Sequence, residues 1–377
     1  MDIPIIKKTT GGPNPPMTLT LDSQILGEKR NVYIQLPEGY DRTQKVYPIL
    51  CVLDGEWLFE TVRANMRFYS EYEVMGINLP QMVVIGIENV DRDRDYVPTP
   101  DPQDPPLYKT AGEADLFAEF LNNELFPYFE QNFRVLPNRT VVGWSFSGLF
   151  ALYSAVRHQD LFDAFLCIGP AIWWDDELVV KLMRETPLRK KKRVVITCGS
   201  NEKGGTVYES VQNLLKILEE QPVNLEYEYI EIDGVGHSWG IPEAVDRGFK
   251  HLFRNYLPSE EFSSLGDLKE YYAHLSQGWG FEVFPPDSPL IDLANKLLAS
   301  KETDGAFEVL DTLLTISPNC SLGHFYMGNC LLLLDQVPDA VKAFQDAIDV
   351  ELARPVPNFV YLQAYRRKIE KMSGSPQ

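Results

Sequence analysis

The spacing of hydrophobic residues predicts a long alternation of strands and helices over the first two thirds of the chain. Runs of consecutive apolar residues, many of them β-branched, are typical of strands buried on both faces. Between these runs, apolar residues recur every three or four positions, which predicts amphipathic helices. The strands are expected at 46–53, 82–87, 140–142, 161–168, 194–199 and 224–232. The helices are expected at 59–72, 114–133, 206–221 and 243–257. This order predicts a three-layer α/β domain with a mostly parallel sheet.

Two segments do not follow that alternation. Residues 17–21 and 32–35 alternate between apolar and polar positions, so we expect a β-hairpin that opens the sheet. Residues 91–106 are charged and rich in proline, and we expect a surface loop there.

The last quarter of the chain has only the helical pattern. Small residues recur at a spacing of 34, at Ala294 and Gly328 and again at Ala306 and Ala340. This period is typical of tetratricopeptide helix pairs, in which small residues let two antiparallel helices approach closely. The alternative is an unrelated helical bundle. A last helix at 358–372 is expected to cap the array.

These patterns divide the chain into three parts. Composition changes near Leu257-Pro258, and a segment with one short helix then runs to Pro285-Pro286. We therefore expect an α/β domain at 1–258, a linker at 259–286 and a small all-α, tetratricopeptide-like domain at 287–377. A length of 377 residues fits about two domains.

Composition narrows the classes of partner. The chain has 35 Lys and Arg against 54 Asp and Glu, a net charge of −19, which argues against nucleic acid and anionic membranes as partners. It has no 18-residue apolar run and no apolar leader at its start, so a cytoplasmic location is expected. The five cysteines include no CxxC pair, which predicts reduced, buried thiols, and neither a metal nor a cofactor is expected.

The candidate chemistry begins at residues 140–157, where a strand, a sharp turn and a helix follow one another. The turn reads Gly143-Trp144-Ser145-Phe146-Ser147-Gly148. A nucleophile elbow places one serine at the apex of such a turn and needs small residues two positions before and after it. Gly143 and Ser147 meet that need around Ser145. Ser147 as the nucleophile would make the strand end too late, and the remaining alternative is an ordinary Gly/Ser turn.

A serine nucleophile needs a base, and the base needs an acid. His237 lies in a glycine-rich loop after the last strand, where functional loops of parallel sheets gather. Glu202 is the first acidic residue after the strand at 194–199, which gives the chain order Ser, acid, His. Glu209, on the following helix, is the rival acid. An ordinary loop histidine and a solvated glutamate are the alternatives to these two roles.

The oxyanion of the reaction needs N–H donors, each of which stabilises the transition state by about 3 kcal/mol. One candidate is the backbone N–H of Phe146, which directly follows Ser145. The second is the backbone N–H of Glu56, which follows Gly55 in the loop after the strand at 46–53.

With these motifs in order, the chain resembles the putative esterase family of α/β hydrolases, close to the enterobactin and bacillibactin trilactone esterases and to esterase D-like proteins. The resemblance covers about residues 15–257. It rests on Leu53-Asp54-Gly55, Asp93–Tyr96 with Pro98, Gly143–Leu152, Gly169–Trp174, Gly199–Glu202 and Gly234–His237.

The resemblance implies an α/β-hydrolase fold with Ser145 as nucleophile, His237 as base and Glu202 as acid. It also implies that Arg94 and Trp174 border the substrate pocket. A structural ion pair of Arg94 with a neighbouring Asp, and a core position for Trp173-Trp174, are the alternatives. The chain departs from the family in carrying Trp144 and Ser147, where relatives usually have His and Gly, and in its added helical domain.

We therefore expect a serine carboxylesterase that cleaves a small-molecule ester through an acyl-enzyme. The substrate class stays open between a siderophore lactone and a small acyl ester. The C-terminal repeats leave a protein partner or self-association open. The alternative function is an inactive hydrolase-like scaffold whose repeats bind a protein partner.

Overall fold

The computed structural model describes residues 5–8, 14–71, 79–103, 106–220, 224–354 and 356–372. These residues fall into two units. The α/β unit lies within Met1–Glu38, Val46–Glu71 and Gln81–Arg254, and the helical unit lies within Gly39–Lys45, Tyr72–Pro80 and Asn255–Gln377.

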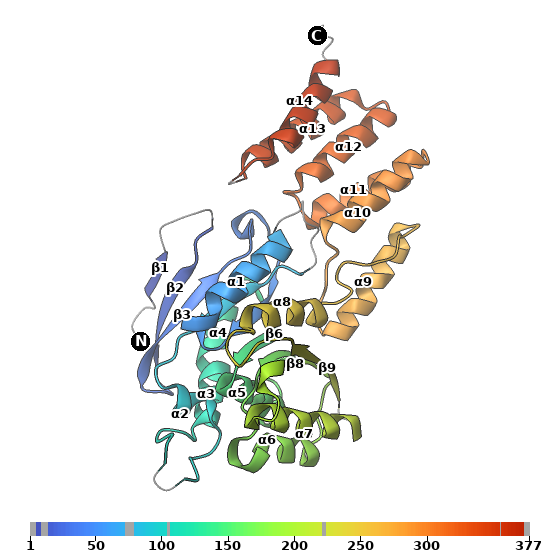
Figure 1. The fold of residues 1–377 in the computed structure, drawn as a ribbon. Helices are drawn as coiled ribbons and strands as arrows, with labels where there is room; N and C mark the ends of the chain where they lie inside the picture. The colour runs from blue at the N-terminus through green and yellow to red at the C-terminus, as the bar shows by residue number, and fades with distance from the viewer. Residues whose placement is uncertain are drawn as a thin grey trace. The chain divides into compact units, whose positions relative to one another are not determined.

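A nine-stranded sheet forms the centre of the α/β unit (Figure 1). Its first three strands pair antiparallel, β3 pairs antiparallel with β5, and every later pairing is parallel. In spatial order the strands are β1 (Ile5–Lys8), β2 (Met17–Ser23), β3 (Glu28–Gln35), β5 (Val83–Ile87), β4 (Tyr47–Val52), β6 (Val135–Trp144), β7 (Ala164–Ile168), β8 (Lys192–Gly199) and β9 (Leu225–Ile232). The predicted hairpin and the mostly parallel sheet are confirmed.

Helices cover the two faces of this sheet. On one face α1 (Gly55–Glu71) packs beside α8 (Ile241–Leu252). On the other, α5 (Phe146–Arg157), α6 (Trp174–Glu185) and α7 (Thr206–Glu220) lie in a row (Figure 1). The central strands β4, β5, β7 and β8 are buried along their whole length, as their continuous apolar runs predict. This is the predicted three-layer α/β-hydrolase architecture.

Two segments differ from the sequence prediction. The helix predicted at 114–133 consists of α3 (Ala114–Phe120), a π-helical turn at Leu121–Leu125 and α4 (Phe126–Asn132). The loop predicted at 91–106 begins with a short helix, α2 (Arg92–Tyr96).

The prediction of a surface loop is wrong for α2, because its Asp95 and Tyr96 are fully buried. Burial of a carboxylate is costly unless the charge is paired. The side chain of Asp95 pairs with Arg30, which reaches it from β3, and with its neighbour Arg94. The partner that makes burial possible is therefore remote in the sequence.

The helical unit consists mainly of six helices among its described residues. They are α9 (Leu265–Trp279), α10 (Asp287–Ala299), α11 (Thr303–Ile316), α12 (Ser321–Leu333), α13 (Val337–Leu352) and α14 (Phe359–Met372). A short 3₁₀ turn, Tyr40–Arg42, belongs to the same unit. The segment predicted as a linker contains α9, whose Leu268 and Tyr272 are buried. The domain boundaries stay a prediction.

The helix spacing agrees with the period of 34 found in the sequence. Helices α10 and α12 begin at residues 287 and 321, and α11 and α13 begin at 303 and 337, each pair 34 positions apart. Gly328 of α12 lies against Phe344 of α13, so closely that a Cβ there would lie 2.6 Å from the ring. The assignment of this unit to the tetratricopeptide class stays a prediction.

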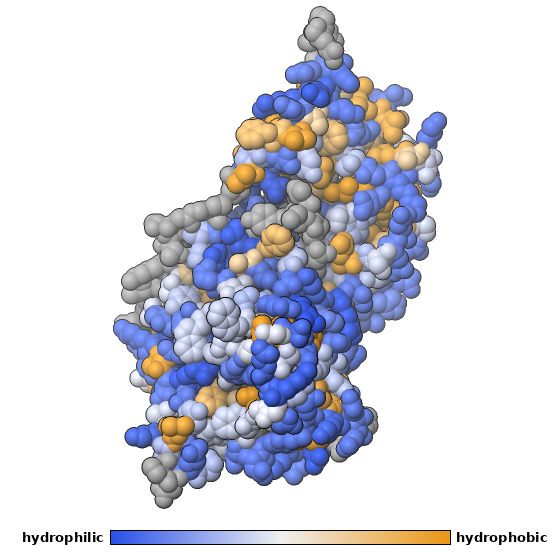
Figure 2. Space-filling model, viewed as in Figure 1, coloured by the Kyte–Doolittle hydropathy of each residue, from blue (hydrophilic) through white to orange (hydrophobic). Residues whose placement is uncertain are grey.

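The surface of the helical unit carries hydrophobic residues around the start of α14 (Figure 2). Leu352, Val356, Phe359 and Val360 of this stretch are between 49% and 77% exposed. Within the parts of the chain that the structure describes, we find no helix of the length and apolar character needed to cross a membrane.

The contact between α12 and α13 gives a direct test of their close packing. Gly328→Ala should lower the melting temperature of the full chain, because overpacking typically costs about 1–3 kcal/mol. The matched control is Gly305→Ala in α11, where a Cβ would meet Leu297 at an ordinary 3.6 Å. Alanine favours a helix by about 1 kcal/mol over glycine, so this control should be neutral or stabilising. Equal melting temperatures for the two variants, measured by calorimetry, would contradict the packing.

Candidate active site

Ser145 is the single residue that connects a strand to a helix. Strand β6 ends at Trp144 and α5 begins at Phe146, and Ser145 between them has a φ of 58° and a ψ of −115°. A positive φ is uncommon for a residue with a side chain and is kept only where its surroundings enforce it. Here the N–H of Ser145 donates to Ile168 O at 3.0 Å, and its carbonyl accepts from Ala171 N at 3.0 Å. Strained backbone at the apex of such a turn is the geometry of a nucleophile elbow.

Gly143 is what lets the helix turn back so tightly. A Cβ at Gly143 would lie 2.4 Å from the carbonyl oxygen of Ser147 and 2.8 Å from the backbone nitrogen of Gly148. Because these are backbone atoms, no side chain can move aside. Glycine two positions before Ser145 is therefore a requirement of this turn.

The two serines of the turn differ in their surroundings. Ser147 is fully buried, and its Oγ donates to Asp54 Oδ2 at 2.6 Å and accepts from Trp144 N at 2.7 Å. Ser145 is partly exposed at the apex. This contrast favours Ser145 over Ser147 as the reactive serine, in the register that the sequence predicts.

His237 and Glu202 are brought together from two loops. The Nδ1 of His237 lies 2.8 Å from Glu202 Oε1, and the other carboxylate oxygen accepts from Gly199 N at 3.0 Å. Within the part of the chain that the structure describes, no hydrogen bond to the imidazole Nε2 is found. The rival acid Glu209 is exposed on α7.

The imidazole of His237 lies next to the elbow. Its ring is 5.2 Å from the ring of Trp144, and the indole N–H of Trp144 donates to His237 O at 3.0 Å. On its other side the ring lies against Gly169, where a Cβ would be 3.1 Å from it. Gly169 directly follows Ile168, which accepts the hydrogen bond from Ser145 N. Within the described residues no hydrogen bond joins Ser145 Oγ to His237, and such contacts often tighten only when substrate binds.

The charge state of Glu202 follows from its contacts. Burial raises the pKa of this carboxyl, but the hydrogen bonds from His237 and from Gly199 N–H outweigh burial. The pKa of Glu202 therefore lies below its ordinary value of 4.5. Glu202 is an acceptor at neutral pH, which holds the imidazole with its proton on Nδ1.

The two candidate oxyanion donors lie in first turns of helices. Phe146 opens α5, and Glu56 is the second residue of α1. Backbone N–H groups at these positions have no carbonyl acceptor within their own helix. Both N–H groups can therefore donate to an anion, and the positive end of the helix dipole favours one there.

Arg94 has the contacts of a structural residue. Its guanidinium binds Glu28 at 2.7 and 3.1 Å and Asp95 at 2.9 Å. These contacts match the alternative of a structural ion pair. Trp174 is 2% exposed, and its indole N–H donates to Thr99 at 2.9 Å, so it sits in the core behind Phe146, 5.6 Å between ring centres.

The structure brings a different arginine to the elbow. The guanidinium of Arg92 binds both oxygens of Asp54, at 2.7 and 2.9 Å, and donates to Trp144 O at 3.0 Å. It lies over the rings of Trp57, Trp144 and Phe146. Burial lowers the pKa of Arg92, but the hydrogen bonds and charge of Asp54 more than offset it. The sequence carries Arg92 and Arg94 in one charged segment and gives no signal that separates them.

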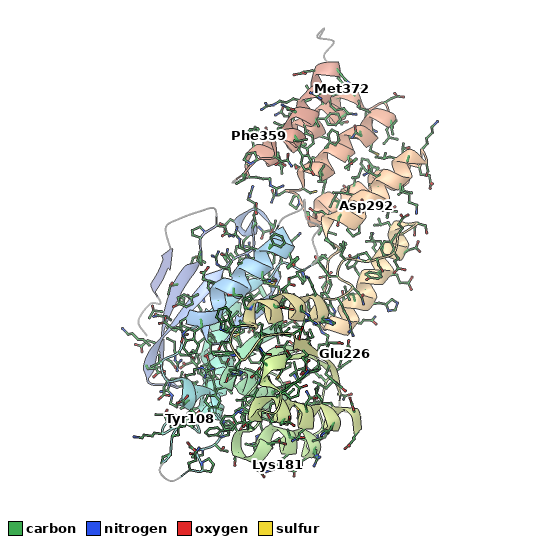
Figure 3. All side chains as sticks on the ribbon, in the orientation of Figure 1. Tyr108, Lys181, Glu226, Asp292, Phe359 and Met372 are labelled. Carbon is green, nitrogen blue, oxygen red and sulfur yellow. The ribbon has the colours of Figure 1, made fainter. Side chains whose placement is uncertain are left out.

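Aromatic rings pack against the elbow, and a cavity lies on the side of Glu202. Tyr108, labelled in Figure 3, packs 5.1 Å from Phe146 and 5.4 Å from Trp174. A cavity of about 630 Å³ opens beside Glu202. It is lined by Trp173 and by residues 201–207. Trp173, rather than Trp174, therefore borders open space.

The cysteine side chains lie in the interior of the protein. All five cysteines are free and buried, as predicted. Among the residues that the structure describes, no three His, Cys, Asp or Glu side chains gather as a metal site.

The contact between Glu202 and His237 predicts a pH-dependent contribution to stability. The pKa of Glu202 is depressed in the folded state. The ionised carboxylate therefore stabilises the fold fully at pH values well above its ordinary pKa of 4.5, and this stabilisation is lost as the pH falls through the folded-state pKa. The difference in melting temperature between wild type and Glu202→Gln should shrink as the pH falls below about 4.5. Glu209→Gln controls for the loss of one charge. A difference that grows as the pH falls below about 4.5 would contradict the assignment.

The comparisons with known proteins identify the family. The model of the family described as "Putative esterase" matches residues 23–241. The uncharacterized protein YbbA of Bacillus subtilis is 25% identical over 48% of this chain and 72% of its own length. A siderophore enterobactin esterase of Emericella nidulans is 26% identical over 42% of this chain and 59% of its own length.

Solved structures agree with the fold. An IroE-like serine hydrolase from Shewanella oneidensis superposes with a TM-score of 0.69 at 25% identity, covering 79% of this chain and 98% of that one. An uncharacterised protein from Capnocytophaga ochracea, 17% identical, has the same fold over 96% of this chain and all of its own, with a TM-score of 0.60. The chain therefore belongs to the putative esterase family and is a hydrolase that acts on ester bonds.

Proposed function

We propose that Ser145, His237 and Glu202 form a catalytic triad that hydrolyses a carboxylic ester through an acyl-enzyme. The observation that carries this proposal is the 2.8 Å contact between His237 Nδ1 and Glu202, made beside the strained turn of Ser145. A serine at such a turn, a histidine held by a carboxylate and a helix N-terminus at the serine are the parts that acyl transfer requires.

Each group then has one task in the reaction. Ser145 Oγ attacks the ester carbonyl while His237 Nε2 accepts the serine proton. Glu202 accepts the hydrogen bond from Nδ1–H, which orients the ring and stabilises the imidazolium. The N–H groups of Phe146 and Glu56 bind the developing oxyanion. His237 gives the proton to the leaving alcohol, and a water molecule repeats the sequence to release the acid.

For the substrate we propose an uncharged small-molecule ester. Relatives of this chain include proteins named as siderophore esterases. One class of siderophore complex, the ferric tris-catecholates, is strongly anionic. The two arginines that would attract such an anion are ion-paired within the chain, Arg92 with Asp54 and Arg94 with Glu28 and Asp95. The chain as a whole carries a net charge of −19, which opposes the approach of an anion.

The proposal also covers the cellular location of the protein and the role of its helical unit. The free, buried cysteines support a cytoplasmic location. The helix spacing of 34 supports a tetratricopeptide-like helical unit, and a protein partner or self-association through this unit belongs to the same proposal.

Removal of the proposed nucleophile tests this function. Ser145→Ala should reduce kcat for p-nitrophenyl butyrate by at least about 1000-fold, because acyl transfer loses its attacking group. Ser154→Ala, which removes a buried hydroxyl from the same helix α5, should keep near wild-type activity. An esterase panel that includes a trilactone and a feruloyl ester would compare the substrate classes.

Two outcomes would contradict the proposal. Wild-type hydrolysis by Ser145→Ala would exclude this serine. A folded wild type that is inert to every ester of the panel would favour the inactive scaffold.

A further inference from the structure

Asp54 is the residue that joins the loop after β4 to the rest of the site. It is fully buried and has a φ of 52°, a conformation that aspartate tolerates better than most residues. Its carbonyl accepts from Trp57 N and Leu58 N, both at 2.9 Å, and so starts helix α1. The position of Asp54 therefore fixes the first turn of α1, where Glu56 N–H lies.

The loop after β4 is also held by its close approach to strand β5. A Cβ at Gly55 would lie 2.7 Å from the backbone of Gly86 and Ile87 in β5. The loop is thus wedged against β5, and the N–H of Asp54 also donates to the hydroxyl of Tyr96 at 3.1 Å. The Asp54 carboxylate adds further contacts. Asn89 Nδ2 donates to Oδ1 at 2.8 Å, Arg92 binds both oxygens, and Ser147 donates to Oδ2 at 2.6 Å.

Of these contacts, the one from Ser147 leads directly to the elbow. Ser147 lies two residues after Ser145, and its Oγ also accepts from Trp144 N at 2.7 Å. Arg92 makes a second link, because the guanidinium that binds Asp54 also donates to Trp144 O. Trp144, the residue that precedes Ser145, is therefore linked to Asp54 through both its backbone N–H and its carbonyl.

We propose that Ser147 and Asp54 are positioning residues for ester hydrolysis, and that their hydrogen bond sets the loop bearing Glu56 against the turn bearing Ser145 and Phe146. The proposal rests on the proposed function, since it assumes that these N–H groups bind the oxyanion. Such donors must lie within about 2.7–3.1 Å of the oxyanion, and a small displacement weakens them. A glycine at position 147 could not make this bond.

Ser147→Ala removes the hydroxyl without a demand on the backbone. We expect kcat per titrated active site to fall about tenfold, less than the 100-fold or more expected when an oxyanion donor is lost outright. KM should stay within twofold. The inhibition constant of a trifluoromethyl ketone, which forms a tetrahedral adduct with the nucleophile, should rise by the same factor as kcat falls.

The controls separate positioning from folding. Active sites are counted by titration with a fluorophosphonate, so misfolded protein does not lower the measured kcat. Ser154→Ala is the matched control, because Ser154 is a fully buried serine of α5 whose Oγ donates within its own helix to Ala151 O, at 2.8 Å. Ser147→Gly removes the same hydrogen bond and serves if the alanine variant does not fold.

The outcomes are distinct. A kcat per site within twofold of wild type, or a lower kcat with an unchanged inhibition constant, would overturn the positioning role. A wild type that takes up no fluorophosphonate would instead refute the proposed function itself, before any variant is compared.

Discussion

The close approach of β6 and α5 at Gly143 is the constraint on which the site depends. The helix turns back over the strand so tightly that the carbonyl of Ser147 occupies the place of a Cβ at residue 143. This approach forces Ser145 into a positive φ, and bonds to Ile168 and Ala171 in the neighbouring segment hold it there. The fold thus places Ser145 at the carboxyl end of the central strands, and the loop that carries His237 lies at the same edge of the sheet.

Paired buried charges connect the elbow to the neighbouring loops and hold those loops in place. Asp54 would be unstable in its fully buried position without Arg92, Asn89 and Ser147. Similarly, Arg30 from β3 pairs with Asp95 of α2. This pair fixes α2, and Arg92 is the first residue of that helix. Two side chains of the elbow make further hydrogen bonds to neighbouring loops, Ser147 to Asp54 and Trp144 to the carbonyl of His237.

The sequence was informative where a residue's role depends on its neighbours in the chain. Apolar runs predicted the buried strands, and the order of strands and loops led to Glu202 and His237, which the structure places in contact. It was uninformative where the partner is remote. The burial of Asp95 depends on Arg30, and the choice between Arg92 and Arg94 depends on which guanidinium meets Asp54. Similarly, adjacent Trp173 and Trp174 differ only through the cavity and core around them.

The most direct measurement of the central claim is the site of covalent labelling by a fluorophosphonate. Trypsin cleaves after Arg139 and Arg157 and releases residues 140–157, which contain Ser145, Ser147 and Ser154. Phe146 separates the first two serines, so fragment ions in a tandem mass spectrum assign the adduct to one of them. The account predicts an adduct on Ser145 alone. An adduct on Ser147, or a folded protein that remains unlabelled beside a labelled control hydrolase, would contradict it.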